Sequence, residues 1–116
     1  MQPTHEEMIQ FLFTAAAFGT IVANNACISG AEGGCQAEIG TATAMAAAAA
    51  VETAGGTQHQ AAKAMAIALK NILGLVCDPV AGLVEIPCVK RNATGTANAI
   101  TAADIALAGV NNTIQC

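Results

Sequence analysis

Two stretches rich in glycine, proline and asparagine interrupt this sequence and limit how it can fold. They lie at about residues 25–35 and 74–90. Proline lacks a backbone N–H and glycine readily adopts positive φ, so a regular helix cannot run through either stretch. The segments around them are apolar and rich in alanine, the best helix former. We therefore expect an all-α fold, a compact helical bundle with cysteine-bearing loops.

The ends of the expected helices carry local signals. Thr4 with Glu7, and Thr57 with Gln60, match the capping box, in which two residues satisfy free N–H groups of the first turn. Glycines mark expected helix ends near residues 55, 74 and 109. The sequence predicts helices over residues 5–23, 36–54, 58–73 and about 90–108, and a short extended piece at residues 83–86.

The first apolar run, from Met8 to Ala23, is hydrophobic on all faces, which predicts a helix at the centre of the bundle. It is too short, and with Gln10 and Thr14 inside it too polar, to predict a membrane span. The acidic segment His5–Glu7 precedes it, where a signal peptide carries positive charge. We therefore expect a cytoplasmic protein that does not associate with a membrane.

Charge is scarce in this chain. Its 116 residues make one domain at most. Only 10% of them are charged and 54% are hydrophobic, whereas an average soluble domain has about 25% charged residues. So few charges cannot cover a small globule, which favours a piece of a larger protein over a free-standing domain. The net charge of −4, with only four basic residues, argues against nucleic acid as a partner.

The five cysteines are an odd number, which fits poorly with a closed disulfide framework. In a cytoplasmic chain thiols stay reduced, and grouped cysteines then point to metal binding or catalysis. Three of them, Cys35, Cys77 and Cys88, lie in the two interrupted stretches. No CxxC pair is present, so spacing alone leaves buried free thiols, a zinc site and an iron–sulfur cluster open.

A cluster with three cysteine ligands has a chemical consequence. Its fourth iron has no protein thiolate and is free to take a substrate oxygen. Such an iron acts as a Lewis acid and helps a hydroxyl group to leave as water. We therefore interpret the three cysteines as the centre of a dehydratase rather than of an electron-transfer protein.

Two motifs carry a resemblance to a known family. They are Ser29-Gly-Ala-Glu-Gly-Gly-Cys-Gln-Ala-Glu38, together with the preceding Asn24-Asn25, and Gly74-Leu-Val-Cys-Asp-Pro-Val-Ala-Gly-Leu-Val-Glu-Ile-Pro-Cys-Val-Lys-Arg-Asn92. With these the chain resembles the iron–sulfur-dependent L-serine dehydratases, and more narrowly the α subunit of the two-subunit bacterial form. The resemblance covers essentially the whole chain. Residues 1–116 would then be part of the catalytic domain, truncated at both ends.

The resemblance implies an activity and a cofactor. Members of this family are lyases that convert L-serine to pyruvate and ammonia, in amino-acid degradation and gluconeogenesis. They use a [4Fe–4S] cluster and no pyridoxal phosphate, and by motif its ligands here are Cys35, Cys77 and Cys88. A β subunit or β domain would be the partner, in an oligomer. The fragment alone would be inactive.

Other polar residues are candidates for binding the substrate. They are Asn25, Ser29, Gly30 and Arg91, of which Arg91 suits either a substrate carboxylate or the negative charge of a cluster. Ordinary structure explains them as well: helix capping for the asparagine, tight turning for the glycine and a solvated helix start for the arginine. No catalytic base can be named, because His5 and His59 lie at expected helix starts away from the cysteines.

Two cysteines remain outside the proposed ligand set. Cys27 is expected to pack as a small apolar side chain, and Cys116 to be an internal residue of a longer protein. A rival interpretation of the whole chain is a non-catalytic helical packing module with buried or zinc-bound cysteines. The low charge and the absence of recognisable acid–base groups favour that rival.

Overall fold

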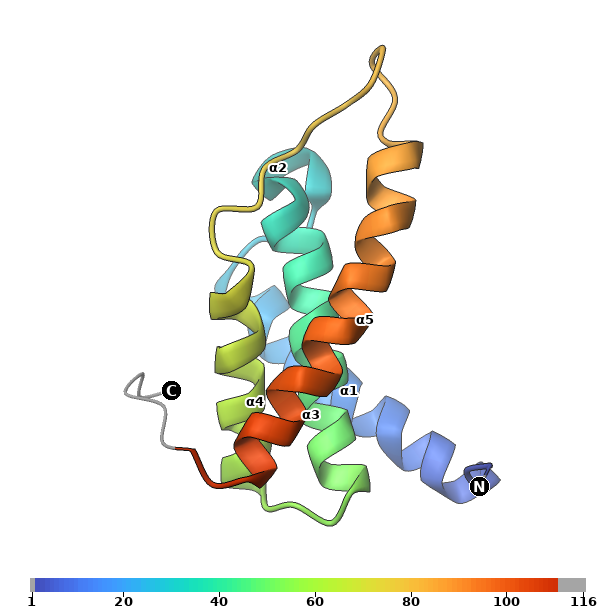
Figure 1. Ribbon diagram of the computed structural model, residues 1–116, viewed down its shortest axis with the longest axis vertical. Coiled ribbons are helices and arrows are strands. Elements are labelled where there is room, and N and C mark those ends of the chain that lie inside the picture. Colours follow the sequence, from blue (N-terminus) through green and yellow to red (C-terminus); the bar gives the residue numbers. More distant parts are fainter. Residues whose placement is uncertain (1, 111–116) are drawn as a thin grey trace.

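The computed structural model describes residues 2–110, and in them the chain is an all-α bundle, as predicted (Figure 1). The described part contains no β-strand, only an isolated bridge between Val80 and Leu83. The elements follow one another as α1 (His5–Asn25), α2 (Gly30–Cys35), the π-helix η1 (Gln36–Gly40), α3 (Thr41–Thr53), α4 (Gln58–Asn71) and α5 (Glu85–Leu107).

Both predicted capping boxes are confirmed. The Thr4 hydroxyl accepts a hydrogen bond from the Glu7 N–H, and the Glu7 carboxylate accepts one from the Thr4 N–H. Thr57 and Gln60 make the same pair of bonds at the start of α4. Each box satisfies N–H groups that have no partner within the helix. These two helices therefore begin where local sequence places them.

Alanine builds the core. Helix α3 lies in the middle of the bundle and packs against α1, α4 and α5. Its residues Ala44, Ala47, Ala48 and Ala49 are fully buried, and Val51 is the largest fully buried side chain among the described residues. Because alanine has only a Cβ, neighbouring helices approach closely along these faces. The alanine-rich sequence of α3 thus allows tight helix packing at the centre of the bundle.

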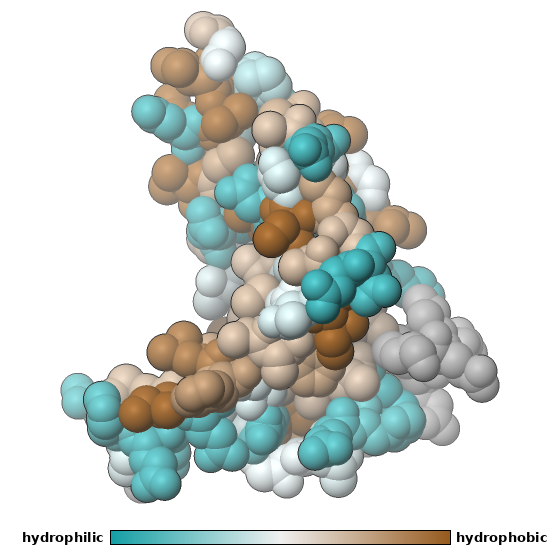
Figure 2. Space-filling view, turned by 180° about the vertical axis from the view of Figure 1, so that it is seen from behind, coloured by the Kyte–Doolittle hydropathy of each residue, from teal (hydrophilic) through white to brown (hydrophobic). Residues whose placement is uncertain are grey.

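The prediction that the first helix lies at the centre is wrong. Helix α1 projects from the bundle, and only its Ala15 is buried (Figures 1 and 2). It packs on α3 along one narrow stripe, where a Cβ at Gly19 would lie 2.8 Å from the Met45 sulfur. Leu12 and Phe13, 65% and 74% exposed, have no such partner. An apolar sequence favours burial, but burial also needs a facing element.

The length of α1 also differs from the prediction. It has 21 residues and starts where predicted, but it continues through Asn24 and ends at Asn25. By length and composition it could cross a membrane, and it is the one helix among residues 2–110 that could. Core helices and signal sequences pass the same test, so this property alone assigns no location.

The last helix begins earlier than predicted. A start at about residue 90 was expected, because Pro87 was read as loop, yet α5 starts at Glu85. Pro87 lies in the first turn, where N–H groups have no helical partner and proline is tolerated. The prediction of an extended piece at residues 83–86 is therefore wrong for residues 85 and 86, which belong to α5. Cys88 also lies on a helix rather than in a loop. The predicted end near Gly109 is confirmed, with φ of 78° at that residue.

Candidate functional site

The cysteines singled out by sequence come from three separate elements at one end of the bundle (Figure 1). Cys35 ends α2 and leads into η1, and it is buried. Cys77 is exposed in the loop between α4 and α5. Cys88 lies half-buried in the first turn of α5. The fold thus brings together thiols that are far apart in sequence.

Gly34 permits a close approach between two of these segments. Its φ of 69° and ψ of −167° break the helical path just before Cys35. A Cβ at this position would lie 3.6 Å from the backbone nitrogen of Cys77. A side chain here would be strained by the positive φ, whereas its distance to the Cys77 nitrogen would be an ordinary van der Waals contact. Glycine is therefore needed for the turn into Cys35, and the Cys77 loop lies beside that turn.

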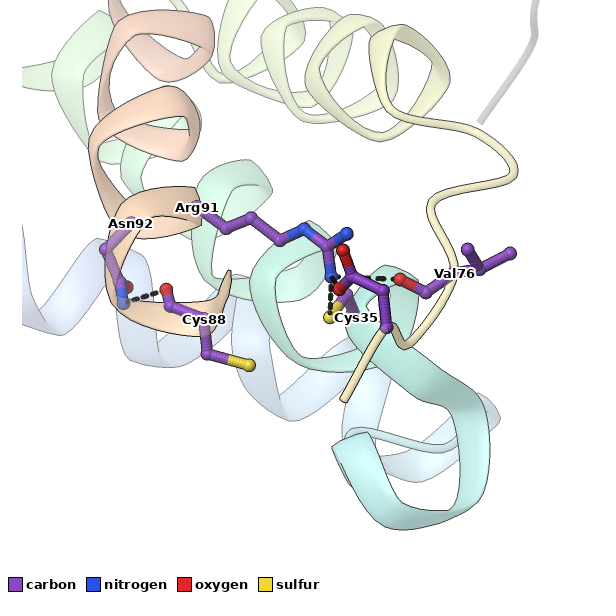
Figure 3. A network of polar contacts seen from close by, with 6 residues as sticks. Cys35, Val76, Cys88, Arg91 and Asn92 are labelled. Carbon is purple, nitrogen blue, oxygen red and sulfur yellow. Dashed lines mark hydrogen bonds and ion pairs between the residues drawn. The ribbon is translucent and has the colours of Figure 1, made fainter. Parts of the chain in front are cut away.

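Arg91 is the polar centre of this end of the bundle. Its Nη1 donates hydrogen bonds to the Cys35 Sγ at 2.7 Å and to the Val76 carbonyl at 2.9 Å (Figure 3). The same nitrogen pairs with the Asp78 carboxylate at 2.6 Å. Partial burial works against the charged form, but the hydrogen bond to Cys35 and the charges on Cys35 and Asp78 outweigh it and raise the pKa of Arg91. A permanent positive charge therefore lies beside the Cys35 thiol.

The three thiols share one electrostatic neighbourhood. Burial raises the pKa of the Cys88 thiol, and a hydrogen bond with Cys35 and the negative charges of Cys35, Glu38 and Cys77 raise it further. The site therefore consists of three thiols, the Asp78 and Glu38 carboxylates and the Arg91 guanidinium.

Glu38 is a site residue that sequence reasoning missed. It lies on η1, three residues after Cys35, and its carboxylate fills the space beside Gly30 that a Cβ there would occupy. A side chain at position 30 would force the Glu38 carboxylate to rotate away. The signal was present in the sequence, because residues three apart on a helix lie on the same face. To use this signal, one must know that the helix continues directly from Cys35.

The other predicted substrate-binding residues lie near the Cys35 turn. Ser29 precedes α2, and its N–H donates to the Cys27 sulfur at 3.3 Å. The Asn25 side chain donates to the Ile21 carbonyl at 2.7 Å, within its own helix. The Cys27 thiol in turn donates to the Glu32 carboxylate at 3.2 Å. No contact here tests a substrate role, and Cys116 lies outside the described residues.

The two histidines are remote, as expected. His59 lies near the start of α4, about 18 Å along the helix from its end at Asn71, at a rise of about 1.5 Å per residue. His5 starts α1 and lies about 30 Å along that helix from Asn25 by the same rise. In both cases the far end of the helix leads into the thiol site.

The donor set can be tested against the kinds of metal centre left open by sequence. No group of three or more histidine, cysteine or acidic side chains within residues 2–110 is placed to bind a single metal ion. An iron–sulfur cluster makes a different demand, because each cysteine binds its own iron and the sulfurs need not meet at one atom. Three cysteine sulfurs from one end of the bundle are donors of the kind that an iron–sulfur cluster uses, although thiolates bind zinc as well.

Comparison with known proteins places the chain in a family context. The family model described as "Serine dehydratase alpha chain" matches residues 1–116. The chain is 71% identical over 116 residues to the "Probable L-serine dehydratase, alpha chain" of Bacillus subtilis (strain 168), covering all of this chain and 39% of that protein. It is 66% identical over 105 residues to the protein of the same name from Latilactobacillus sakei, covering 90% of this chain and 50% of the relative.

A more distant relative gives the same picture. The "L-serine dehydratase TdcG" of Escherichia coli (strain K12) is 50% identical over 107 residues, which cover 91% of this chain and 24% of that protein. The chain thus spans half or less of the length of these relatives.

Proposed function

The chain belongs to the serine dehydratase alpha chain family, and from this premise we propose that it is part of the catalytic domain of an enzyme that converts L-serine to pyruvate and ammonia. The resemblance drawn from its two motifs is thereby confirmed at the level of the family. One structural observation supports the activity most directly: the segments that carry Cys35, Cys77 and Cys88 meet at Arg91. The relatives are at least twice as long as the matched region, so the activity belongs to the longer protein.

The proposed cofactor is a [4Fe–4S] cluster held by Cys35, Cys77 and Cys88, with no pyridoxal phosphate. When bound, it supplies an iron without a protein thiolate, which acts as a Lewis acid on the serine hydroxyl. The cysteine sulfurs support this choice. The positive charge of Arg91 beside Cys35 supports it as well, because a thiol becomes a negatively charged thiolate when it binds iron.

The chain's own residues take simpler roles in this proposal. Ser29 and Gly30 lie at the start of the Cys35 turn, where they would line the substrate pocket, and Asn25 precedes them at the end of α1. Gly30 leaves room for the Glu38 carboxylate, which keeps a negative charge near Cys88. We further propose a cytoplasmic location, a β subunit or β domain as partner in an oligomer, and a role in amino-acid degradation and gluconeogenesis.

Anaerobic reconstitution with iron and sulfide tests the cofactor. We expect a brown species that absorbs at about 400 nm, as is typical of thiolate-bound iron–sulfur centres. A Cys77→Ala variant should lose it, and the matched control Cys27→Ala should keep it. The cofactor proposal fails if the chain stays colourless and takes up only zinc.

The activity needs its own test in a longer protein that contains this chain. Pyruvate should form from L-serine without added pyridoxal phosphate. An intact cluster without pyruvate formation would refute the reaction while leaving the cofactor in place. The rival interpretation, a packing module with buried or zinc-bound thiols, is not favoured, because the family match covers the whole chain and residues 2–110 offer no single-ion site.

A further inference from the structure

Arg91 contacts each of the three segments that carry the proposed ligands. It lies on α5 three residues after Cys88, one turn along the same face. Its Nη1 reaches the Cys35 sulfur, and it also binds Val76 and Asp78, the two residues that flank Cys77. We infer that Arg91 is the positioning residue that gathers the three cysteines, and that this is its role rather than binding the substrate carboxylate.

The Cys77 loop depends on these contacts. Its own backbone bonds join Leu75 to Ile72 and Val80 to Leu83, so they hold the loop only to itself and to the end of α4. In the described part of the chain, the hydrogen bonds and ion pairs that tie residues 76–83 to another element all end on Arg91. The loop is exposed, so it has little apolar burial to hold it in place of these bonds.

The bond to Cys35 has a second effect. The Arg91 side chain is only 18% exposed, so its hydrogen bonds are partly shielded from water. A guanidinium presents several donors in a fixed fork, and it stays charged at any working pH. It therefore holds the Cys35 sulfur in one orientation. For a bound cluster, a hydrogen bond to a ligating sulfur raises the reduction potential. This second effect rests on the proposed function, whereas the gathering of the loop does not.

The test uses the full chain with four substitutions. Arg91→Gln removes the charge and the fork, and Arg91→Lys keeps the charge. Asp78→Asn removes only the ion pair, on an exposed loop where the change cannot unfold the bundle. Lys90→Gln is the matched control, because it removes the adjacent cation on the exposed face of the same turn. Circular dichroism shows that each variant keeps its helices.

Two measurements on the chain without a cluster test the gathering of the loop. We expect hydrogen exchange of residues 76–83 and alkylation of the buried Cys35 to become about 10-fold faster in Arg91→Gln, the fold-change that corresponds to losing a hydrogen bond made by a charged group. Asp78→Asn should speed exchange of the loop but not alkylation of Cys35. Arg91→Lys should restore most of the protection, and Lys90→Gln should match the parent chain. Unchanged exchange and alkylation in Arg91→Gln would overturn the inference.

Reconstitution with iron and sulfide then tests the link to the cluster. Arg91→Gln should bind iron about 10- to 100-fold more weakly, the usual cost of losing a supporting contact. The cluster that does form should have a lower midpoint potential than in the parent chain. Normal loading and potential in Arg91→Gln would refute this part. A parent chain that takes up no cluster would refute the proposed cofactor instead, and the exchange and alkylation results would still decide the role of Arg91.

Discussion

Gly95 controls how closely α5 approaches the Cys35 segment. It is buried one turn after Arg91, where α5 crosses η1 and the start of α3. A Cβ at this position would lie 2.7 Å from the Thr43 hydroxyl and 3.3 Å from the Ile39 Cγ2. The first distance is shorter than real Cβ contacts allow, so Gly95→Ala forces one of the two helices to move.

The sign of this substitution follows from what Thr43 can do. Alanine is the better helix former, worth about 1 kcal/mol over glycine inside a helix. Against this, extra atoms in a packed core cost about 1–3 kcal/mol. Thr43 cannot rotate away cheaply, because it is buried, is β-branched, and donates to the Ile39 carbonyl at 2.7 Å. We therefore place the cost near the upper end and expect a net loss of about 1–2 kcal/mol in the free energy of unfolding.

Urea unfolding of four proteins measures this: the parent, Gly95→Ala, Thr43→Ala, and the double variant. Thr43→Ala removes the hydroxyl that the new Cβ meets, so the double variant should be more stable than the sum of the single effects predicts, by about 1 kcal/mol or more. Alkylation of Cys35 should also be faster in Gly95→Ala, since α5 carries Arg91 with it. The reasoning is refuted if Gly95→Ala stabilises the chain by the full helix-propensity gain.

Three further predictions test other parts of the structure. Thr57→Ala removes the cap of α4 and should cost about 1 kcal/mol, seen as a thermal midpoint about 3–6 °C lower; no change would mean that Gln60 alone caps the helix. Leu12→Gln, on the exposed face of α1, should change unfolding by less than about 0.5 kcal/mol, whereas a core-sized loss would show that this face is buried in solution. Folding raises the pKa of the Cys88 thiol above its ordinary value of 9.0. The protonated thiol therefore contributes to the stability of the folded chain below pH 9.0, and this contribution is lost as the pH rises through the higher folded pKa. Its alkylation by iodoacetamide should therefore be half-maximal above pH 9.0 and shift downward in Cys35→Ala.

The features that sequence predicted well depend on neighbours within a few residues. Both capping boxes and the glycine helix ends are local, so the bundle and most helix boundaries followed from them. The exposure of α1 is not local. It depends on whether another element faces Leu12 and Phe13, and no periodicity within α1 contains that information. The early start of α5 was missed because Pro87 was treated as a helix breaker, although its place in the first turn makes it harmless.

The candidate site likewise has features that the sequence predicts and features that depend on distant parts of the chain. Its motifs named the cysteine segments, but they gave no distance between them. From sequence alone, Arg91 is a cation close to Cys88. A substrate carboxylate, a cluster and solvent are equally good candidates for its partner. Its actual partners, Cys35 and the residues around Cys77, lie 13 or more positions away. Long-range pairings of this kind come from packing of the alanine core, which sets how α5 and η1 cross.

The three thiols also differ in how firmly the fold holds them. Cys35 is buried at the junction of α2 and η1, and Cys88 lies on a helix whose alanines pack into the core. Both are therefore held by burial that does not depend on a bound group. Cys77 lies in an exposed loop, and in the described part of the chain the polar links from that loop to other elements end on Arg91. Ordering a backbone residue costs about 1–2 kcal/mol, and here a few bonds of one side chain must offset that cost over the loop. The site is thus preorganised at Cys35 and Cys88, and the position of Cys77 depends on Arg91.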